Sequence, residues 1–244
     1  MPITFTTAAG PLASSDDWAA TTEAREWKRG RAARELARAW WPGLDPEVPQ
    51  ELTDLLGPFL RVEEVQVLGG TRLRITARDA AGPAAVHLLA VADETFGEKI
   101  EPTLVEAARG AARDAHQDLG ERILAHAAGV LAPWRDGLPH LGELRVDLLD
   151  AVARTLEFAD EVGTARAIFV VHELVHLQRT RESARRRNRE DLDRFVRRLT
   201  GGETERLHRG VLLGPLTTPG HGEIELFVGK IRRDLDTLTT QESR

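Results

Sequence analysis

The spacing of hydrophobic residues divides the chain into helical and strand-like segments. Between residues 17 and 41, apolar side chains recur every three or four positions, as at Ala33, Leu36 and Trp40. This spacing predicts one helix, with Gly30 as its weak point because glycine disfavours helix. Residues 46–56 repeat the pattern over a shorter length and predict a second helix.

The pattern then changes to alternation. Residues 60–68 are strand-like, with adjacent Glu63 and Glu64 indicating a bulge, and Gly69-Gly70 predicts a hairpin turn. Residues 72–78 alternate strictly, and residues 84–92 are almost wholly apolar. These features predict three consecutive strands, of which the third is buried on both faces and carries His87 as a core histidine.

The rest of the chain predicts helices that alternate with two further strands. A capping box at Thr103 indicates a helix that runs to about residue 131, and residues 143–162 and 188–199 also have helical spacing. Residues 165–171 form a continuous β-branched run, and Ile224, Leu226 and Val228 alternate on a last strand. Because the strand at 165–171 follows a helical crossover, it should lie parallel to a strand already in the sheet.

These elements predict an α/β fold, a mixed sheet with an antiparallel meander flanked by helices. We expect a flexible N-terminus at residues 1–15, one domain at 16–233 and a frayed tail at 234–244. Hydrophobic residues make up 41% of the 244, which is enough for a core.

Composition narrows the possible chemistry. The absence of cysteine excludes disulfides, thiol catalysis and cysteine-bound metals. We find no run of about 20 apolar residues and no secretory leader, so we expect a cytoplasmic protein without a membrane partner.

The net charge of −6 argues against a protein that coats nucleic acid by charge alone, yet basic residues are locally concentrated. Arg185, Arg186 and Arg187 lie in an arginine-rich run at residues 179–189. They are candidate nucleic-acid contacts, and the alternative is an ordinary solvated helix end. The chain has no tyrosine, so aromatic base stacking is not indicated in this run.

Several short segments resemble a known family. They are Trp27-Lys28-Arg29-Gly30, the Gly69-Gly70 hairpin and Asp93-Glu94-Thr95-Phe96-Gly97. Together with the order of elements over residues 16–232, they resemble an uncharacterised bacterial family of the PD-(D/E)XK class. The resemblance implies a restriction-endonuclease-like core.

The resemblance fails at the catalytic positions. Nucleases of this class hold Mg²⁺ or Mn²⁺ with an aspartate and an acid-x-lysine triplet, and the metal activates water. Counted back from Asp93, the triplet positions are Leu89 and Val91, and the aspartate would fall near Thr71. We therefore predict a degenerate nuclease-like protein, without a cofactor, that acts through a protein or nucleic-acid partner.

An active nuclease with a relocated Mg²⁺ or Mn²⁺ site is an alternative. The residues available for such a site are Glu64, Asp79, Asp93 and Lys99.

A zinc metallopeptidase is the third hypothesis, because His172-Glu173-Leu174-Val175-His176 is an H-E-x-x-H sequence. On a helix, His172 and His176 could bind zinc with Glu173 as general base, and Glu205 and His208 could add ligands. The preceding β-branched run favours a strand instead, on which the two histidines would be about 13 Å apart.

Overall fold

The computed structural model describes residues 3–43, 45–57, 60–110, 117–176 and 178–235. Its strands are β1 (Thr4–Thr7), β2 (Gly10–Pro11), β3 (Arg61–Val67), β4 (Arg72–Asp79), β5 (Gly82–Val91), β6 (Arg166–Val175), β7 (Leu212–Thr218) and β8 (His221–Asp234). Its helices are α1 (Ser15–Ala20), α2 (Ala32–Trp40), α3 (Gln50–Leu56), α4 (Ile100–Gly110), α5 (Gln117–Val130), the 3-10 turn η1 (Leu141–Glu143), α6 (Val146–Glu161) and α7 (Glu182–Leu199).

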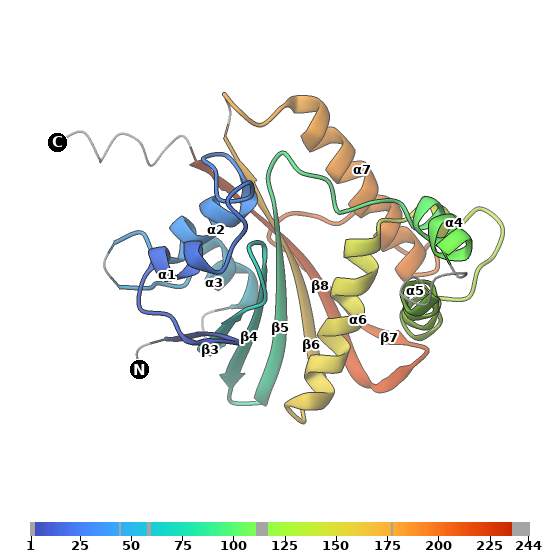
Figure 1. Ribbon diagram of the computed structural model, residues 1–244. Coiled ribbons are helices and arrows are strands. Elements are labelled where there is room, and N and C mark those ends of the chain that lie inside the picture. Colours follow the sequence, from blue (N-terminus) through green and yellow to red (C-terminus); the bar gives the residue numbers. More distant parts are fainter. Residues whose placement is uncertain (1–2, 44, 58–59, 111–116, 177, 236–244) are drawn as a thin grey trace.

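The described strands form one mixed sheet in the order β2-β1-β3-β4-β5-β6-β8-β7 (Figure 1). β3, β4 and β5 are an antiparallel meander, while β6 pairs parallel with both β5 and β8. The predicted meander and the parallel return of the fourth strand are confirmed. The register of β3 against β4 shifts between Val62 and Glu64, as the adjacent glutamates predicted.

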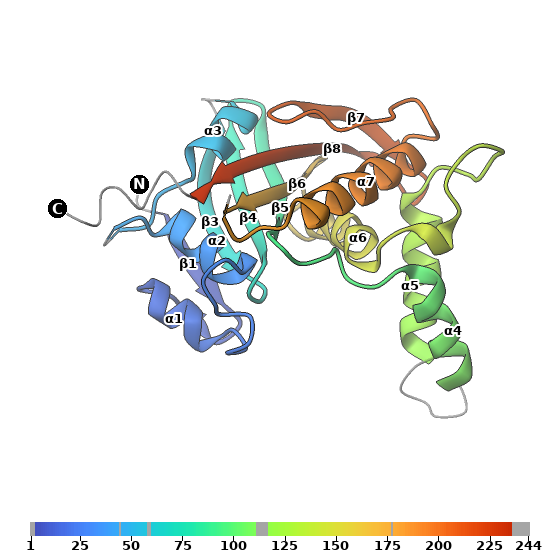
Figure 2. The ribbon, with the colours of Figure 1, turned by 90° about the horizontal axis from the view of Figure 1, so that it is seen from above.

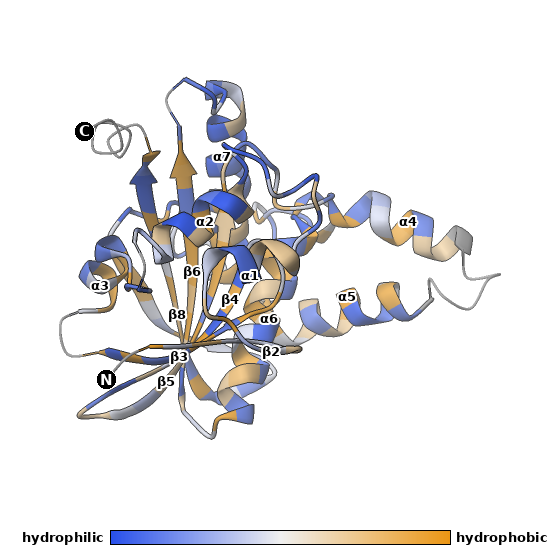
Figure 3. Cartoon of the chain, turned by 60° about the vertical axis from the view of Figure 1, so that its left-hand side comes forward, coloured by the Kyte–Doolittle hydropathy of each residue, from blue (hydrophilic) through white to orange (hydrophobic). Residues whose placement is uncertain are grey.

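Helices cover both faces of the sheet. On one face, α6 and α7 bury residues such as Leu156 and Phe195 against Phe169 and Val171 of β6. On the other face, α2 and α3 pack against the alternate positions of the same strands, such as Val170. Figure 3 shows the result: the central strands are largely hydrophobic, and hydrophilic segments lie close to their C-terminal ends.

Several predicted boundaries were wrong. The helix predicted at 17–41 is two helices, α1 and α2, and Gly30 between them adopts a φ of +85°. The helix expected to begin at Thr103 already begins at Ile100. Residues 1–15 were predicted to be flexible, but β1 pairs parallel with β3 and buries Phe5. In the predicted tail, Asp234 ends β8, and residues 236–244 lie outside the described residues.

α4 and α5 pack against each other and project away from the sheet (Figure 2). Every helix in the described part of the chain is too short or too polar to pass through a membrane.

His87 is an unusual member of the core. It lies on β5 opposite Arg74 of β4 and is fully buried, as predicted. Neither ring nitrogen has a hydrogen-bond partner among the described residues. Burial, reinforced by Arg72 and Arg74, lowers the pKa of His87 to about 3.

His87 should therefore make stability fall in mild acid. The unfolded chain binds a proton near pH 6.5, whereas the folded ring stays neutral down to about pH 3, so stability is lost as the pH falls below 6.5. Between pH 7.5 and 5 this loss should be about 2 kcal/mol. We expect His87→Leu to reduce the pH dependence of the unfolding free energy, measured with urea, by that amount. His140→Leu, at an exposed histidine, is the control, and an unchanged pH dependence in His87→Leu would contradict the prediction.

Candidate functional site

The positions that a PD-(D/E)XK nuclease would use are not acidic in this fold. Leu89 and Val91 on β5 are buried, with 4% and 3% of their surface exposed. Arg72 on β4 lies directly opposite Leu89, and its guanidinium donates to Asp147 at 2.7 Å and to Asp150 at 2.8 Å. A cation paired with two carboxylates therefore lies beside Thr71, near which a metal-binding aspartate would be expected.

The residues considered for a relocated metal site are also not brought together. Asp79 is bound to Arg166 at 2.8 Å where β5 begins, whereas Asp93 is bound to Arg181 at 3.1 Å beyond the other end of that strand. Glu64 is exposed on β3 and accepts a hydrogen bond from Thr6 at 3.4 Å, and Lys99 is exposed in the segment before α4.

The H-E-x-x-H sequence lies on a strand. β6 contains His172 and Glu173 and runs to Val175, four residues further than predicted, and His176 follows it. Four positions along a strand span about 13 Å, too far for both histidines to bind one ion. Glu205 and His208 are exposed in a segment that is not helical. Among the described residues, no three histidine, aspartate or glutamate side chains are grouped so that they could hold a metal.

His172, which is fully buried, instead contacts a half-buried ion pair on the α3 face of the sheet. Its Nε2 lies 2.9 Å from Oε1 of Glu51, and Glu51 also accepts hydrogen bonds from Arg233 at 2.7 and 2.9 Å. Burial alone would raise the pKa of Glu51, but hydrogen bonds from His172 and Arg233 outweigh it and hold the pKa at about 2. Burial lowers the pKa of His172, so its ring is neutral near pH 7.

On the opposite face of the sheet, a groove of about 540 Å³ opens at the C-terminal ends of β6 and β8. We call it the basic groove, because its lining includes Arg185, Arg186, Arg189, Arg206, Arg209, Lys230 and Arg232. The acidic residues in its lining are Glu173, Glu182 and Asp193. Seven cations against three carboxylates make a strongly positive concavity on a chain whose net charge is −6.

Three elements position these side chains. β6 and β8 run parallel, so both end at the same edge of the sheet and present Glu173, Lys230 and Arg232 there. Successive turns of α7 carry the groove arginines along one side, and a bridge between Arg209 and Lys230 holds the segment before β7 against β8. Lys230 is 7% exposed, and its Nζ lies 3.8 Å from Glu173, so this lysine is fixed in the lining of the groove.

The lining of the groove contains residues from two of the hypotheses drawn from the sequence. Arg185 and Arg186 from the arginine run line it, together with Glu173 and His208 from the zinc hypothesis. Arg187 is not part of the lining. Lys230 and Arg232 were not predicted as site residues. A lysine and an arginine at the end of an otherwise alternating strand nevertheless indicate a polar site there.

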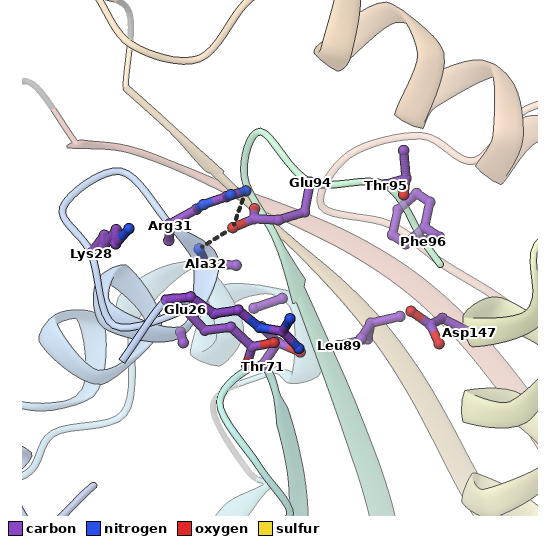
Figure 4. A pocket seen from close by; sticks show the side chains of 13 residues that line it. Glu26, Lys28, Arg31, Ala32, Thr71, Leu89, Glu94, Thr95, Phe96 and Asp147 are labelled. Carbon is purple, nitrogen blue, oxygen red and sulfur yellow. Dashed lines mark hydrogen bonds and ion pairs between the residues drawn. The ribbon is translucent and has the colours of Figure 1, made fainter. Parts of the chain in front are cut away.

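A second concavity, of about 450 Å³, lies beside the C-terminal end of β5 (Figure 4). We call it the mixed pocket, because three basic and three acidic residues line it together with apolar ones. The charged residues are Arg25, Lys28, Arg31, Glu26, Glu94 and Asp147. Its lining also contains Thr71 and Leu89, so it includes positions at which the PD-(D/E)XK resemblance would put catalytic residues.

The Glu51 ion pair gives a stability test for the role of His172. Because the folded pKa of Glu51 is below its ordinary 4.5, its contribution is present above pH 4.5 and is lost as the pH falls towards 2. We expect Glu51→Gln to lower the unfolding free energy at pH 7 by about 2–3 kcal/mol, and the difference from the unchanged protein to shrink below pH 4.5.

Urea unfolding measures this effect, and Glu47→Gln, at an exposed glutamate, is the control. A chelator should leave all three proteins unchanged. A chelator-induced loss of stability that zinc restores would show instead that His172 holds a metal.

Comparison with known proteins places the chain in a family but shows no activity for it. No curated protein and no solved structure matches the chain. Residues 11–235 match a family model, from the last residue of β2 to the residue after β8. That span includes the basic groove, the mixed pocket and the Glu51 ion pair. The chain therefore belongs to the family described as Domain of unknown function (DUF6946).

Proposed function

We propose that this protein binds nucleic acid through its basic groove and does not cleave it. The observation that carries the proposal is the concentration of seven basic side chains in one concavity of an acidic protein. Like charges that are brought together in this way repel one another, so the arrangement costs stability unless a polyanion neutralises it.

The side chains of the groove suit phosphate groups. Most of its cations are arginines, whose planar guanidinium can donate two parallel hydrogen bonds to a phosphate. Arg186 is 68% exposed, and its nearest carboxylate, on Glu190, lies 3.9 Å away, so its donors remain available. Lys230 is fixed in the lining of the same groove by Glu173 and adds a point charge.

A non-catalytic role follows from the missing metal ligands. Phosphodiester cleavage by this class needs carboxylates that hold a metal ion, which then activates water. Leu89 and Val91 cannot bind a cation, and Arg72 across from Leu89 repels one. A restriction-endonuclease-like core is part of this proposal. Its support is the antiparallel meander followed by a helical crossover to a parallel strand.

Reversing the charge of the groove should abolish binding. We expect the double variant Arg186→Glu/Arg189→Glu to weaken binding of a 20-nucleotide single-stranded DNA by at least tenfold at 0.1 M salt. The slope of log affinity against log salt should become shallower by about 1.4, because two phosphate contacts are lost. Fluorescence anisotropy over a salt series measures both quantities.

The matched control is Arg61→Glu/Arg78→Glu, which makes the same change of charge at two exposed arginines. These arginines pair across β3 and β4 at the end of the sheet opposite the groove. The control should bind almost as the unchanged protein does, since the long-range effect of net charge is screened by salt. Equal losses in the two double variants would show that net charge matters and the groove does not.

The protein should not cut nucleic acid. We expect no nicking of supercoiled plasmid and no cleavage of single-stranded DNA or RNA with 10 mM Mg²⁺ or Mn²⁺, because the metal-binding positions are apolar or basic. Gel electrophoresis after prolonged incubation tests this. Cleavage that persists through purification and disappears in Glu64→Ala or Asp93→Ala would establish a relocated active site.

A further inference from the structure

The mixed pocket differs from the basic groove in chemistry. Its three cations are matched by three carboxylates, two of which are already engaged within the protein. Asp147 accepts from Arg72 at 2.7 Å, while Glu94 accepts from the backbone N–H groups of Ala32 and Ala92, each at 3.2 Å. Because cations and carboxylates in the lining are equal in number and Arg31 lies 3.4 Å from Glu94, the pocket has no excess positive charge for a phosphate and fits a neutral ligand.

The surfaces of the pocket suit a flat heterocycle. Ala33, Leu89, Ala90 and Phe96 form the apolar part of the lining, each with at most 4% of its surface exposed. Thr71 and Thr95 carry hydroxyl groups that can donate or accept (Figure 4). Arg31 adds a donor and Asp147 an acceptor. Burial raises the pKa of Asp147 even though Arg72 opposes that shift, so the environment disfavours further negative charge. Apolar surface with a few donors and acceptors is the composition that recognises an unstacked nucleobase.

The mixed pocket and the basic groove are linked through the residues that follow β5 and through α7. Asp93 and Glu94, which follow β5, lie between them: Asp93 binds Arg181 at the start of α7, and Asn188 of α7 donates to the backbone carbonyl of Glu94 at 2.7 Å. Glu94 itself lines the mixed pocket, and α7 carries Arg185 and Arg189 of the groove. The two concavities are therefore adjacent.

Exposed cations bridge the interval between them. Arg181 has 68% of its side chain exposed, and Arg179 is exposed with its side chain alongside Gly30 in the segment that carries Lys28 and Arg31. A strand whose phosphates occupy the groove can continue past these arginines to the mouth of the mixed pocket.

We propose that the mixed pocket receives one unstacked nucleobase of a single strand whose phosphates lie in the basic groove. The inference rests on the proposed function and adds a preference for single-stranded over duplex nucleic acid, since a paired base is not available to enter the pocket. The groove supplies affinity for any phosphate chain, and the mixed pocket supplies the distinction between a strand with bases and one without.

Three probes separate these contributions: a 15-nucleotide single-stranded DNA, a strand of the same length made of abasic units, and inorganic polyphosphate. The unchanged protein should bind the DNA on the order of tenfold more tightly than the abasic strand, the range expected for one enclosed base. Thr71→Trp, which fills the pocket, should reduce that preference to less than threefold while the affinity for polyphosphate stays the same.

Thr95→Trp fills the pocket from another residue and serves if Thr71→Trp fails to fold. Thr217→Trp adds the same bulk at an exposed position on β7 and is the matched control. The groove variant Arg186→Glu/Arg189→Glu should lose affinity for all three probes. Equal affinities of the unchanged protein for DNA and the abasic strand would overturn the pocket proposal and leave the groove intact. A preference for DNA that persists in folded Thr71→Trp and Thr95→Trp would also overturn it. Absence of binding to all three probes would refute the proposed function as well.

Discussion

The parallel pairing of β5 with β6 is the contact on which the rest of the fold depends. Both strands are buried on two faces, by α6 and α7 on one side and by α2 and α3 on the other. A polar side chain on such a strand is costly except where the covering helices end, and His87 in the middle of β5 is an exception. Since β5, β6 and β8 all run in the same direction, their polar residues collect at one edge of the sheet, and both concavities lie there.

The same burial favours apolar side chains near the C-terminal end of β5. An acid and a lysine on a central strand need a metal, water or each other to compensate their desolvation. Leu89 and Val91 carry no charge that needs such compensation, and they contribute to the hydrophobic core. Arg72, on the neighbouring strand, donates hydrogen bonds to Asp147 and Asp150 of α6. These bonds connect the meander to the crossover helix.

The sequence predicted the parts of this structure that local patterns specify. Strict alternation identified β4, continuous apolar runs identified β5 and β6, and the paired glutamates marked the bulge in β3. It did not predict β1, which forms by pairing with the distant β3, or β7, which pairs with β8 across register shifts and so lacks a clear alternation. The candidate sites were recognised as separate motifs, and their grouping depends on topology: Glu173 and Lys230 are 57 positions apart and meet only because β6 and β8 are neighbours.

The last residues of β8 help to set the register of this strand in the sheet. Arg232 faces the groove, while Arg233 points to the opposite face and binds Glu51 beside His172. Displacing β8 by one residue in one direction would bring Asp234 beside Glu51, and in the other direction it would bring Ile231 into the groove in place of Arg232. The first slip would set two carboxylates against each other and the second would place an apolar side chain in the groove, so the order Ile231-Arg232-Arg233-Asp234 disfavours both slipped pairings of this 14-residue strand.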